Sequence, residues 1–193
     1  MSSRPNRSQA VRRRKLGGFT LIEIMLVVVI IGILSTFAIP YFLRVTARSR
    51  RAEAMIVLDK VHVYFVNQYE NYGTFNTPEV LGMFGGAANG ISQWNPDPGT
   101  TTGQPAKWVS TRLGWKQIPF AFDGGLKLRF SYQITANDSL TIAVAGEMPG
   151  LGPDITIPPS NGPTPAGNYL YTEVLQGSGG SVFITPPIEI PAM

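Results

Sequence analysis

Hydrophobic and polar positions divide the 193-residue chain into zones with different patterns. Residues 1–18 are polar and basic and have no apolar period, which is typical of a leader segment rather than of a folded element. Residues 19–39 then form an apolar run of 21 positions with a single charged side chain. A helix of this length spans about 30 Å, the thickness of a bilayer core, so the run predicts a membrane-spanning helix.

The helical pattern continues beyond the predicted span. Five apolar residues recur at spacings of 3, 4 or 7 and share one helix face: Ala54, Leu58, Val61, Phe65 and Tyr72. We therefore predict one helix from Phe19 to about Tyr72 that stops at Gly73. Pro40 should kink this helix, because its ring offers no N–H to the carbonyl of Thr36. Residues 40–72 are amphipathic, as expected of a helix that packs one face on a domain.

Residues 73–193 have a different composition, with 18 of the 21 glycines and 14 of the 16 prolines. Two stretches, 126–135 and 139–144, nevertheless alternate apolar and polar side chains, and Asn137-Asp138 lies between them as a hairpin turn. In the first stretch Lys127, Arg129, Ser131, Gln133 and Thr135 share the face opposite the apolar one. These two stretches predict an antiparallel hairpin.

Further strands and loops complete this part of the chain. Residues 168–175 and 181–186 predict a second strand pair, and residues 107–115 are a weaker strand candidate. Residues 82–106 and 147–168 are expected to be long loops. The predicted fold class is α+β: a long N-terminal, membrane-spanning, kinked α-helix that packs against an antiparallel β-sheet, one face of which the helix covers.

Charge is distributed unevenly along the chain. The formal net charge is +4, but residues 1–18 contain six basic and no acidic side chains, which leaves ten basic and 12 acidic ones in residues 19–193. The high pI therefore reflects the leader, and nucleic acid is not an expected partner. The basic leader should stay in the cytoplasm while the rest is exported, although four arginines beyond the span weaken this asymmetry: Arg44, Arg48, Arg50 and Arg51.

A secretory signal peptide is the ordinary interpretation of a basic and apolar beginning. It requires an apolar core of about 7–15 residues, followed by small residues at the cleavage site. Here the apolar run is longer, and the small pair Gly17-Gly18 precedes it. Cleavage after Gly18 would remove the basic charges and keep the apolar helix.

Glu23 is the single charged side chain in the apolar run. An acidic residue costs about 2.5–3.5 kcal/mol at the centre of a membrane helix and less toward its end, so Glu23 needs a partner. If the chain were cut after Gly18, Phe19 would carry a free α-amine one helical turn away. Glu23 could neutralise that amine or the amine of a neighbouring helix, and repetition of the second contact would build a helical filament.

The stretch KLGGFTLIEIMLVVVIIGILSTFAIPYF resembles the N-terminal signature of type IV pilins and type II secretion pseudopilins. The resemblance covers about 50 residues and rests on a basic leader that ends in Gly18, a phenylalanine at Phe19, and a glutamate at the fifth position after cleavage, Glu23. Pro40 lies where many members of the family carry a kinking proline. The remaining 120 or so residues are only generically similar to the family.

The resemblance implies a mechanism and a set of partners. A prepilin peptidase would cleave between Gly18 and Phe19 and methylate the new amine of Phe19. An assembly ATPase and an inner-membrane platform protein would then move subunits from the membrane into a filament, with Glu23 guiding docking. Gly32 and Pro40, both weak helix formers, would let the helix bend or partly melt. The subunit would be a single-pass inner-membrane protein before assembly.

Two features depart from the family pattern. The 18-residue leader is long for the family, so translation could start at Val11 instead of Met1. The chain has no cysteine, so it cannot close the C-terminal loop with the disulfide that many pilins carry. Some pseudopilins bind calcium there instead, but the acidic candidates Asp97, Asp123, Asp138 and Asp154 lack a dense ligand pattern, so no metal or other cofactor is expected.

Three functions remain open from the sequence. The leading hypothesis is a structural subunit of a type IV pilus that serves adhesion, twitching motility or DNA uptake. The alternatives are a pseudopilin of a type II secretion system and, in another class, a single-span membrane-anchored periplasmic binding module. The sequence favours no enzyme, because it shows no nucleophile–base pair, carboxylate dyad or metal cluster in residues 73–193.

The domain hypothesis is a leader (1–18), a membrane and filament-core helix (19–39), its amphipathic continuation (40–72) and an exported head (73–193).

Overall fold

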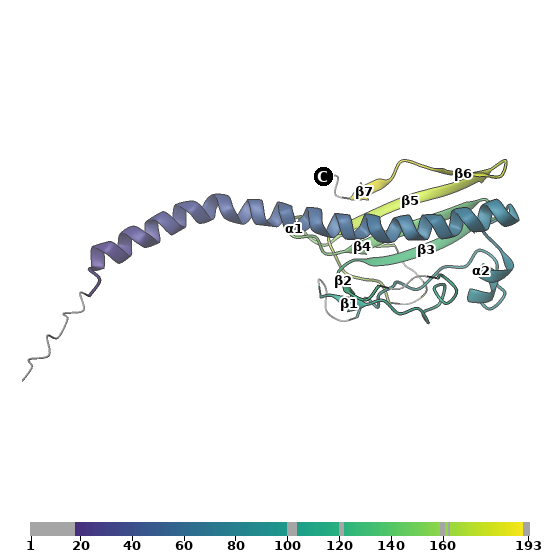
Figure 1. Ribbon diagram of the computed structural model, residues 1–193, viewed down its shortest axis with the longest axis horizontal. Coiled ribbons are helices and arrows are strands. Elements are labelled where there is room, and N and C mark those ends of the chain that lie inside the picture. The colour runs from purple at the N-terminus through teal and green to yellow at the C-terminus, as the bar shows by residue number, and fades with distance from the viewer. Residues whose placement is uncertain (1–17, 100–103, 120–121, 159–160, 162, 191–193) are drawn as a thin grey trace, which may run out of the picture. The chain divides into compact units, whose positions relative to one another are not determined.

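The computed structural model describes residues 18–99, 104–119, 122–158, 161 and 163–190 (Figure 1). The predicted leader, and with it the choice between Met1 and Val11, lies outside the described residues except for Gly18. The chain forms two compact units, one ending at Ile39 and the other beginning at Pro40. The helices and strands of the described part, in chain order, are α1 Leu21–Tyr72, α2 Pro78–Met83, β1 Ala106–Lys107, β2 Gly125–Leu126, β3 Arg129–Ala136, β4 Ser139–Gly146, β5 Tyr169–Ser178, β6 Ser181–Ile184 and β7 Ile188–Ile190.

Helix α1 confirms the prediction of one long helix, with its start at Leu21 instead of Phe19. Its C-terminal end is set by Gly73, which has φ +68° and donates its N–H to the carbonyl of Tyr69 at 2.7 Å. Glycine adopts this left-handed conformation without the steric penalty of a Cβ, so the helix stops where the sequence predicted. The kink at Pro40 stays a prediction.

The sheet is antiparallel, and its strand order is β3-β4-β5-β6, with β7 also paired to β5. The predicted hairpin is confirmed: β3 pairs with β4 across the turn at Asn137 and Asp138. Strands β6 and β7 share one edge of β5, because β6 pairs with Leu175–Ser178 and β7 pairs with Leu170–Thr172. The weaker strand candidate at residues 107–115 was wrong beyond Lys107, since residues 110–117 form turns.

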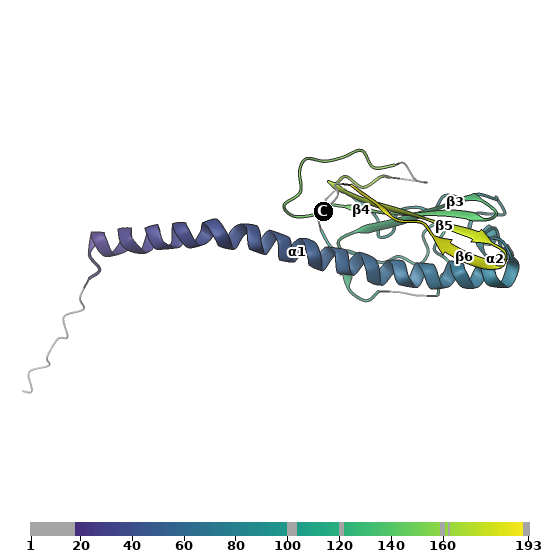
Figure 2. The same ribbon diagram turned by 90° about the horizontal axis from the view of Figure 1, so that it is seen from above.

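The core lies between the second unit's part of α1 and one face of the sheet. Figure 1 shows this part of α1 running along β3, β4 and β5, and Figure 2 shows it on one side of the sheet. Ala54, Leu58, Val61 and Phe65 are buried as predicted. Tyr72 was wrongly placed in the stripe, because it is 56% exposed and Tyr69 fills the last buried position. The ring of Tyr69 lies over Gly177 of β5, where a Cβ would come within 2.1 Å of the Tyr69 ring.

Aromatic rings fill the centre of this core. Tyr132 of β3 is 1% exposed and packs edge-on against Phe65 of α1, Phe84 and Trp115. Its hydroxyl donates to the carbonyl of Gly114, and burial raises the pKa of Tyr132 well above its ordinary value. Trp94 and Trp115 are buried and Trp108 is half-buried, so the three tryptophans anchor the core and the loops around it.

The second face of the sheet is covered as well, which the sequence did not predict. The loop at 91–95 bridges to β3 through Ile91–Gln133 and Asn95–Phe130 pairs. Trp94, Ala145, Ile157 and Leu170 form a small second core on this side. The loop after β4 first contacts α1 at Gly150, and its later part lies on the side away from α1 (Figure 2). The alternating polar residues Arg129 and Ser131, each 4% exposed, are therefore inside the protein.

Arg129 ties the covering loops to the sheet. Its guanidinium donates to the carbonyls of Asp97 (3.0 Å), Leu126 (2.9 Å) and Gln104 (3.0 Å), so a buried charge is satisfied by backbone oxygens. Burial lowers the pKa of Arg129 below its ordinary value. Because these carbonyls belong to the segment before β1 and to β2, this single side chain joins that segment and β2 to β3.

Polar contacts fasten α1 to the sheet at three points. The imidazole of His62 is hydrogen-bonded to the carboxylate of Glu173 of β5, which is 3% exposed and also accepts a hydrogen bond from the Tyr171 hydroxyl at 2.9 Å. Arg51 pairs with Glu189 of β7. The carboxylate of Glu53 accepts the backbone N–H groups of residues 127 and 128 at 2.7 and 3.1 Å. His62 thus has a structural role on the helix.

We predict that His62→Ala destabilises the head by about 1–3 kcal/mol, because it leaves the buried carboxylate of Glu173 without one of its hydrogen-bond partners. The free energy of unfolding of the full chain in detergent, followed by tryptophan fluorescence, measures this. Adding Glu173→Gln to His62→Ala should recover part of the loss, since it removes the unpaired charge. Equal stability of His62→Ala and the wild type would contradict the assignment.

A second prediction concerns acid. The N–H of Gly99 (3.0 Å) and the guanidinium of Arg112 (2.5 Å) lower the pKa of Asp97 below its ordinary value of 3.8. Asp97 therefore makes its full contribution to the free energy of unfolding above about pH 4. This contribution is lost as the pH falls through the lowered pKa that Asp97 has in the folded state. Asp97 is 57% exposed, so its contribution should stay below about 1 kcal/mol.

The comparison with Asp97→Asn isolates this contribution. The stability difference between wild type and variant should be constant between pH 5 and 8 and should shrink at lower pH, as urea unfolding measured across the pH range will show. A difference that grows on acidification would have the wrong sign and would contradict the assignment.

Candidate functional site

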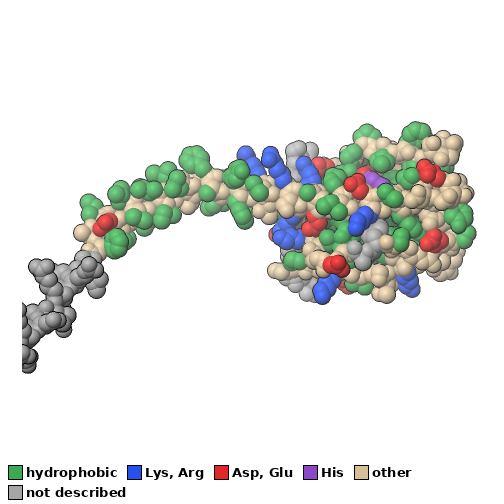
Figure 3. Space-filling model, viewed as in Figure 1, with side chains coloured by type: hydrophobic (Ala, Val, Ile, Leu, Met, Phe, Trp, Pro, Cys, Tyr) green, Lys and Arg blue, Asp and Glu red, His purple; other side chains and the backbone are tan. Residues whose placement is uncertain are grey.

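The N-terminal part of α1 exposes an almost continuous apolar surface. Fifteen large hydrophobic side chains between Phe19 and Ile39 are exposed, and Figure 3 shows hydrophobic side chains along the visible surface of this segment. An 18-residue window of α1 has a mean hydropathy of 2.7 and buries none of its residues, so by length and composition the helix can cross a membrane. The surface requires either lipid or other apolar helices around it.

Glu23 lies in the first turn of α1, within this apolar surface. Its backbone N–H donates to the Thr20 side-chain oxygen at 3.3 Å, and its Oε2 accepts the Thr20 backbone N–H at 3.5 Å. These reciprocal contacts are a capping box, which satisfies two N–H groups that a helix start otherwise leaves without partners. The carboxylate also interacts favourably with the positive end of the helix dipole.

The capping box was missed in the sequence interpretation, although its signature was present. Thr20 and Glu23 are three residues apart and precede an apolar run, which is the pattern of a threonine cap with a glutamate at the third helical position. The box also explains why α1 starts at Leu21 and leaves Gly18 and Phe19 outside the helix. The peptide bond between Gly18 and Phe19 is consequently in an exposed, non-helical segment.

The carboxylate of Glu23 has room for a second partner. The capping contact uses Oε2, and within the described chain the other oxygen, Oε1, has no hydrogen-bond partner. A carboxylate can accept about four hydrogen bonds, so the cap leaves capacity for a cation from outside the subunit. The same group can therefore serve both the helix start and an intermolecular contact.

The structure places Gly32 and Pro40 in α1 without assigning them a contact role. A Cβ at Gly32 would meet nothing within 4 Å in the described subunit, so packing inside the chain does not require this glycine. Its carbonyl accepts the hydroxyl of Thr36 at 3.1 Å. Pro40 is the first residue of the second compact unit. Packing within the described subunit therefore does not account for Gly32, whereas Pro40 lines a hollow of the second unit.

The acidic residues considered for calcium do not come together. Among the described residues, no group of three or more His, Asp or Glu side chains could hold a metal ion. Asp97 is bonded to Arg112 and to the Gly99 N–H. The half-buried His62 of α1 and the buried Glu173 of β5 satisfy each other in a structural pair.

Comparison with known proteins identifies relatives with the same N-terminal segment. A protein-family profile, the prokaryotic N-terminal methylation motif, matches residues 13–39. Two type IV major fimbrial proteins FimA of Dichelobacter nodosus are 36% identical over 100 residues (45% of this chain, 62% of the relative) and 30% identical over 140 residues (67% and 76%). The type IV major pilin protein PilA of Myxococcus xanthus is 44% identical over 61 residues (30% and 28%).

The matches cover different shares of the relatives' lengths. The chain spans less than two thirds of the first FimA relative and of PilA, with the match to PilA covering 28% of that protein. No solved structure matches the chain at a significant level. The second FimA relative is matched over 76% of its length at 30% identity, far beyond the methylation motif. The chain therefore belongs to the type IV pilin family.

Proposed function

We propose that this chain is the precursor of a type IV pilus subunit that polymerises through its N-terminal helix into a surface filament. The observation that carries the proposal is the placement of Glu23, the only charged side chain of residues 19–39, one helical turn after Phe19. An acid in this position is costly in an apolar environment unless a cation meets it. The α-amine of a processed subunit is such a cation.

Processing is proposed to occur between Gly18 and Phe19. A prepilin peptidase would remove residues 1–18 and methylate the amine of Phe19, in agreement with the matched methylation motif. The exposed, non-helical position of Gly18 and Phe19 before α1 supports access by a peptidase. The chain acts as the substrate in this step and not as the enzyme.

Assembly would transfer the apolar helix from the inner membrane to the filament core. The subunit would first be a single-pass membrane protein with its N-terminus in the cytoplasm, and an assembly ATPase with an inner-membrane platform protein would drive extraction. Glu23 would then meet the Phe19 amine of a neighbouring subunit. Gly32 and Pro40 would let the helix adapt, residues 40–72 would hold the exported head (73–193), and no cofactor is invoked.

The names of the relatives favour a pilus over the other two functions. They are described as type IV major fimbrial or pilin proteins, which supports a pilus subunit rather than a secretion pseudopilin. A membrane-anchored binding module would need no intermolecular role for Glu23. Variants of this residue therefore separate a polymerising subunit from a monomeric module.

We predict that Glu23→Gln reduces surface filaments at least about tenfold while the subunit is still processed. Glutamine preserves the capping box but removes the charge, and each 1.4 kcal/mol of lost ion-pair energy is a factor of ten. Electron microscopy and immunoblots of sheared filaments measure the loss, and mass spectrometry of the membrane fraction measures processing.

Thr20→Ala is the matched control for the capping role. It removes the cap side chain and keeps the carboxylate, so it should cost about 1 kcal/mol of helix stability and leave filaments present. If Thr20→Ala abolished filaments and Glu23→Gln did not, the cap and not the charge would be the functional feature. Normal filaments in both variants would reject the proposed mechanism.

A separate prediction concerns the cleavage site. Gly18→Val should block processing, because a branched side chain would replace the small residue at the proposed scissile bond. The membrane-bound chain should then keep residues 1–18, whereas Gly17→Ala should yield a chain that begins at a methylated Phe19. Intact-mass measurement of both variants and the wild type distinguishes these products. If the wild-type chain kept residues 1–18 in cells with an active prepilin peptidase, the proposed cleavage would be wrong.

A further inference from the structure

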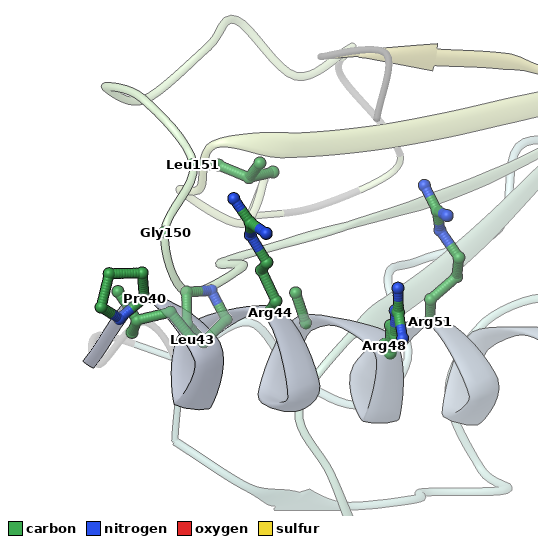
Figure 4. A pocket seen from close by; sticks show the side chains of 9 residues that line it. Pro40, Leu43, Arg44, Arg48, Arg51, Gly150 and Leu151 are labelled. Carbon is green, nitrogen blue, oxygen red and sulfur yellow. The ribbon is translucent and has the colours of Figure 1, made fainter. Parts of the chain in front are cut away.

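A hollow of about 710 Å³ opens at the end of the second unit that follows the apolar run (Figure 4). Its walls come from the start of this unit's helix and from the loop after β4. Figure 4 shows three arginine side chains rising from one face of α1 and, beside them, the apolar residues of the floor and of the loop. The residues that matter for its chemistry are Pro40, Leu43, Leu151, Arg44, Arg48 and Arg51.

Much of the positive charge in this hollow is unpaired. Arg51 forms an ion pair with Glu189, but its Nε is buried and has no hydrogen-bond partner in the described part of the chain. Arg44 and Arg48 are exposed and make no hydrogen bond or ion pair to any described residue. The nearby carboxylate of Glu147 is exposed and is not bonded to them either. The hollow therefore offers several donors to an anion that the subunit does not supply.

The opposite wall is built by a specific loop contact. Gly150 has φ +80°, a conformation that favours glycine, and a Cβ there would lie 3.3 Å from the Cβ of Leu43. The loop therefore lies directly against α1 and places Leu151 across from Arg44 (Figure 4). An apolar wall beside unpaired guanidinium groups suits a ligand that has both an anionic group and hydrocarbon.

The place of the hollow along the chain indicates where this ligand would be found. Pro40 is the first residue after the apolar run, and Arg44 and Arg48 follow it by about 6 and 12 Å of helix. The headgroup layer on each side of a bilayer core is about 5–8 Å thick, and arginine side chains reach back toward it. If residues 19–39 span the membrane, these arginines lie at the headgroups of the exported side.

Arginines at this position also need an explanation. Basic residues near a membrane helix are normally retained on the cytoplasmic side, and here four follow the span within twelve residues: Arg44, Arg48, Arg50 and Arg51. Anionic lipid in the exported leaflet would offset the cost of this placement. Arginine binds phosphate with two parallel hydrogen bonds, which a lipid phosphodiester accepts.

We propose that the hollow binds the headgroup phosphate of an anionic phospholipid, with the glycerol and upper acyl carbons against Leu43 and Leu151. Arg44 and Arg48 bind the phosphate, and the Nε of Arg51 is available as a further donor. This lipid contact rests on the proposed membrane-anchored stage and holds the head at the bilayer surface before assembly. An acidic side chain of a neighbouring subunit would satisfy the charge but has no use for the adjoining apolar wall.

Lipid binding can be measured on the full, uncleaved chain in nonionic detergent. Native mass spectrometry during titration with phosphatidylglycerol should show one lipid bound per chain, with clear preference over phosphatidylcholine. Arg44→Gln combined with Arg48→Gln should weaken phosphatidylglycerol binding about 30-fold, since each arginine near an anionic lipid contributes about fivefold. Both residues are exposed, so the double variant should fold as the wild type does.

The matched control carries the same charge change elsewhere. Lys107 and Lys116 are exposed in the head, and Lys107→Gln with Lys116→Gln should leave phosphatidylglycerol binding unchanged. Inorganic phosphate at concentrations equal to the lipid should not displace it, because phosphate lacks the apolar part. Equal binding of both lipids, full displacement by phosphate, or equal losses in both double variants would overturn the proposal.

A failure here is distinguishable from a failure of the proposed function. The titration uses chains that have been neither processed nor assembled, whereas filament formation is scored separately in cells. If the Arg44 and Arg48 double variant bound phosphatidylglycerol like the wild type but no longer formed filaments, the hollow would be a subunit contact and the lipid proposal would be wrong.

Discussion

The exposed apolar surface of residues 19–39 is the constraint on which everything else depends. Removing its fifteen large side chains from water is worth on the order of 20–45 kcal/mol, whereas a folded domain is stable by about 5–15 kcal/mol. The helix can therefore never stay in water, whatever the head does. It can only move between apolar environments, such as a lipid bilayer and a bundle of apolar helices. Because hydrocarbon side chains are about equally stable in both, the interactions of the one charged side chain contribute much of the free-energy difference between them.

Glu23 has two roles that follow from its position in the first turn of α1. The contact with Thr20 stabilises the helix start within a single chain, which makes the acid tolerable in the isolated subunit. The remaining carboxylate oxygen can meet a cation from another subunit. A residue in the middle of the apolar run could not do both, since neither the helix dipole nor a chain terminus would be near.

In the head, both faces of the sheet are buried, although the chain is of modest size. The helix covers one face and irregular loops cover the other, so the loops need fixed anchors. Arg129 supplies one by binding carbonyls of the segment before β1 and of β2, and Trp94 fills the space between a loop and the sheet. The hydrogen bond of His62 to Glu173 and the ion pair of Arg51 with Glu189 fasten the helix to β5 and β7.

Local chemistry was readable from the sequence wherever neighbouring residues decided it. Apolar periodicity predicted α1, Gly73 predicted its end, alternation predicted the β3–β4 hairpin, and Gly18, Phe19 and Glu23 indicated the family. The predictions for Tyr72 and for a strand beyond Lys107 were wrong, and the loops over the second face of the sheet were not predicted, because these features depend on which distant segments pack together. The pairing of His62 with Glu173, 111 positions apart, and the hollow between Arg44 and Leu151 likewise came only from the tertiary structure, since no local pattern records contacts between distant segments.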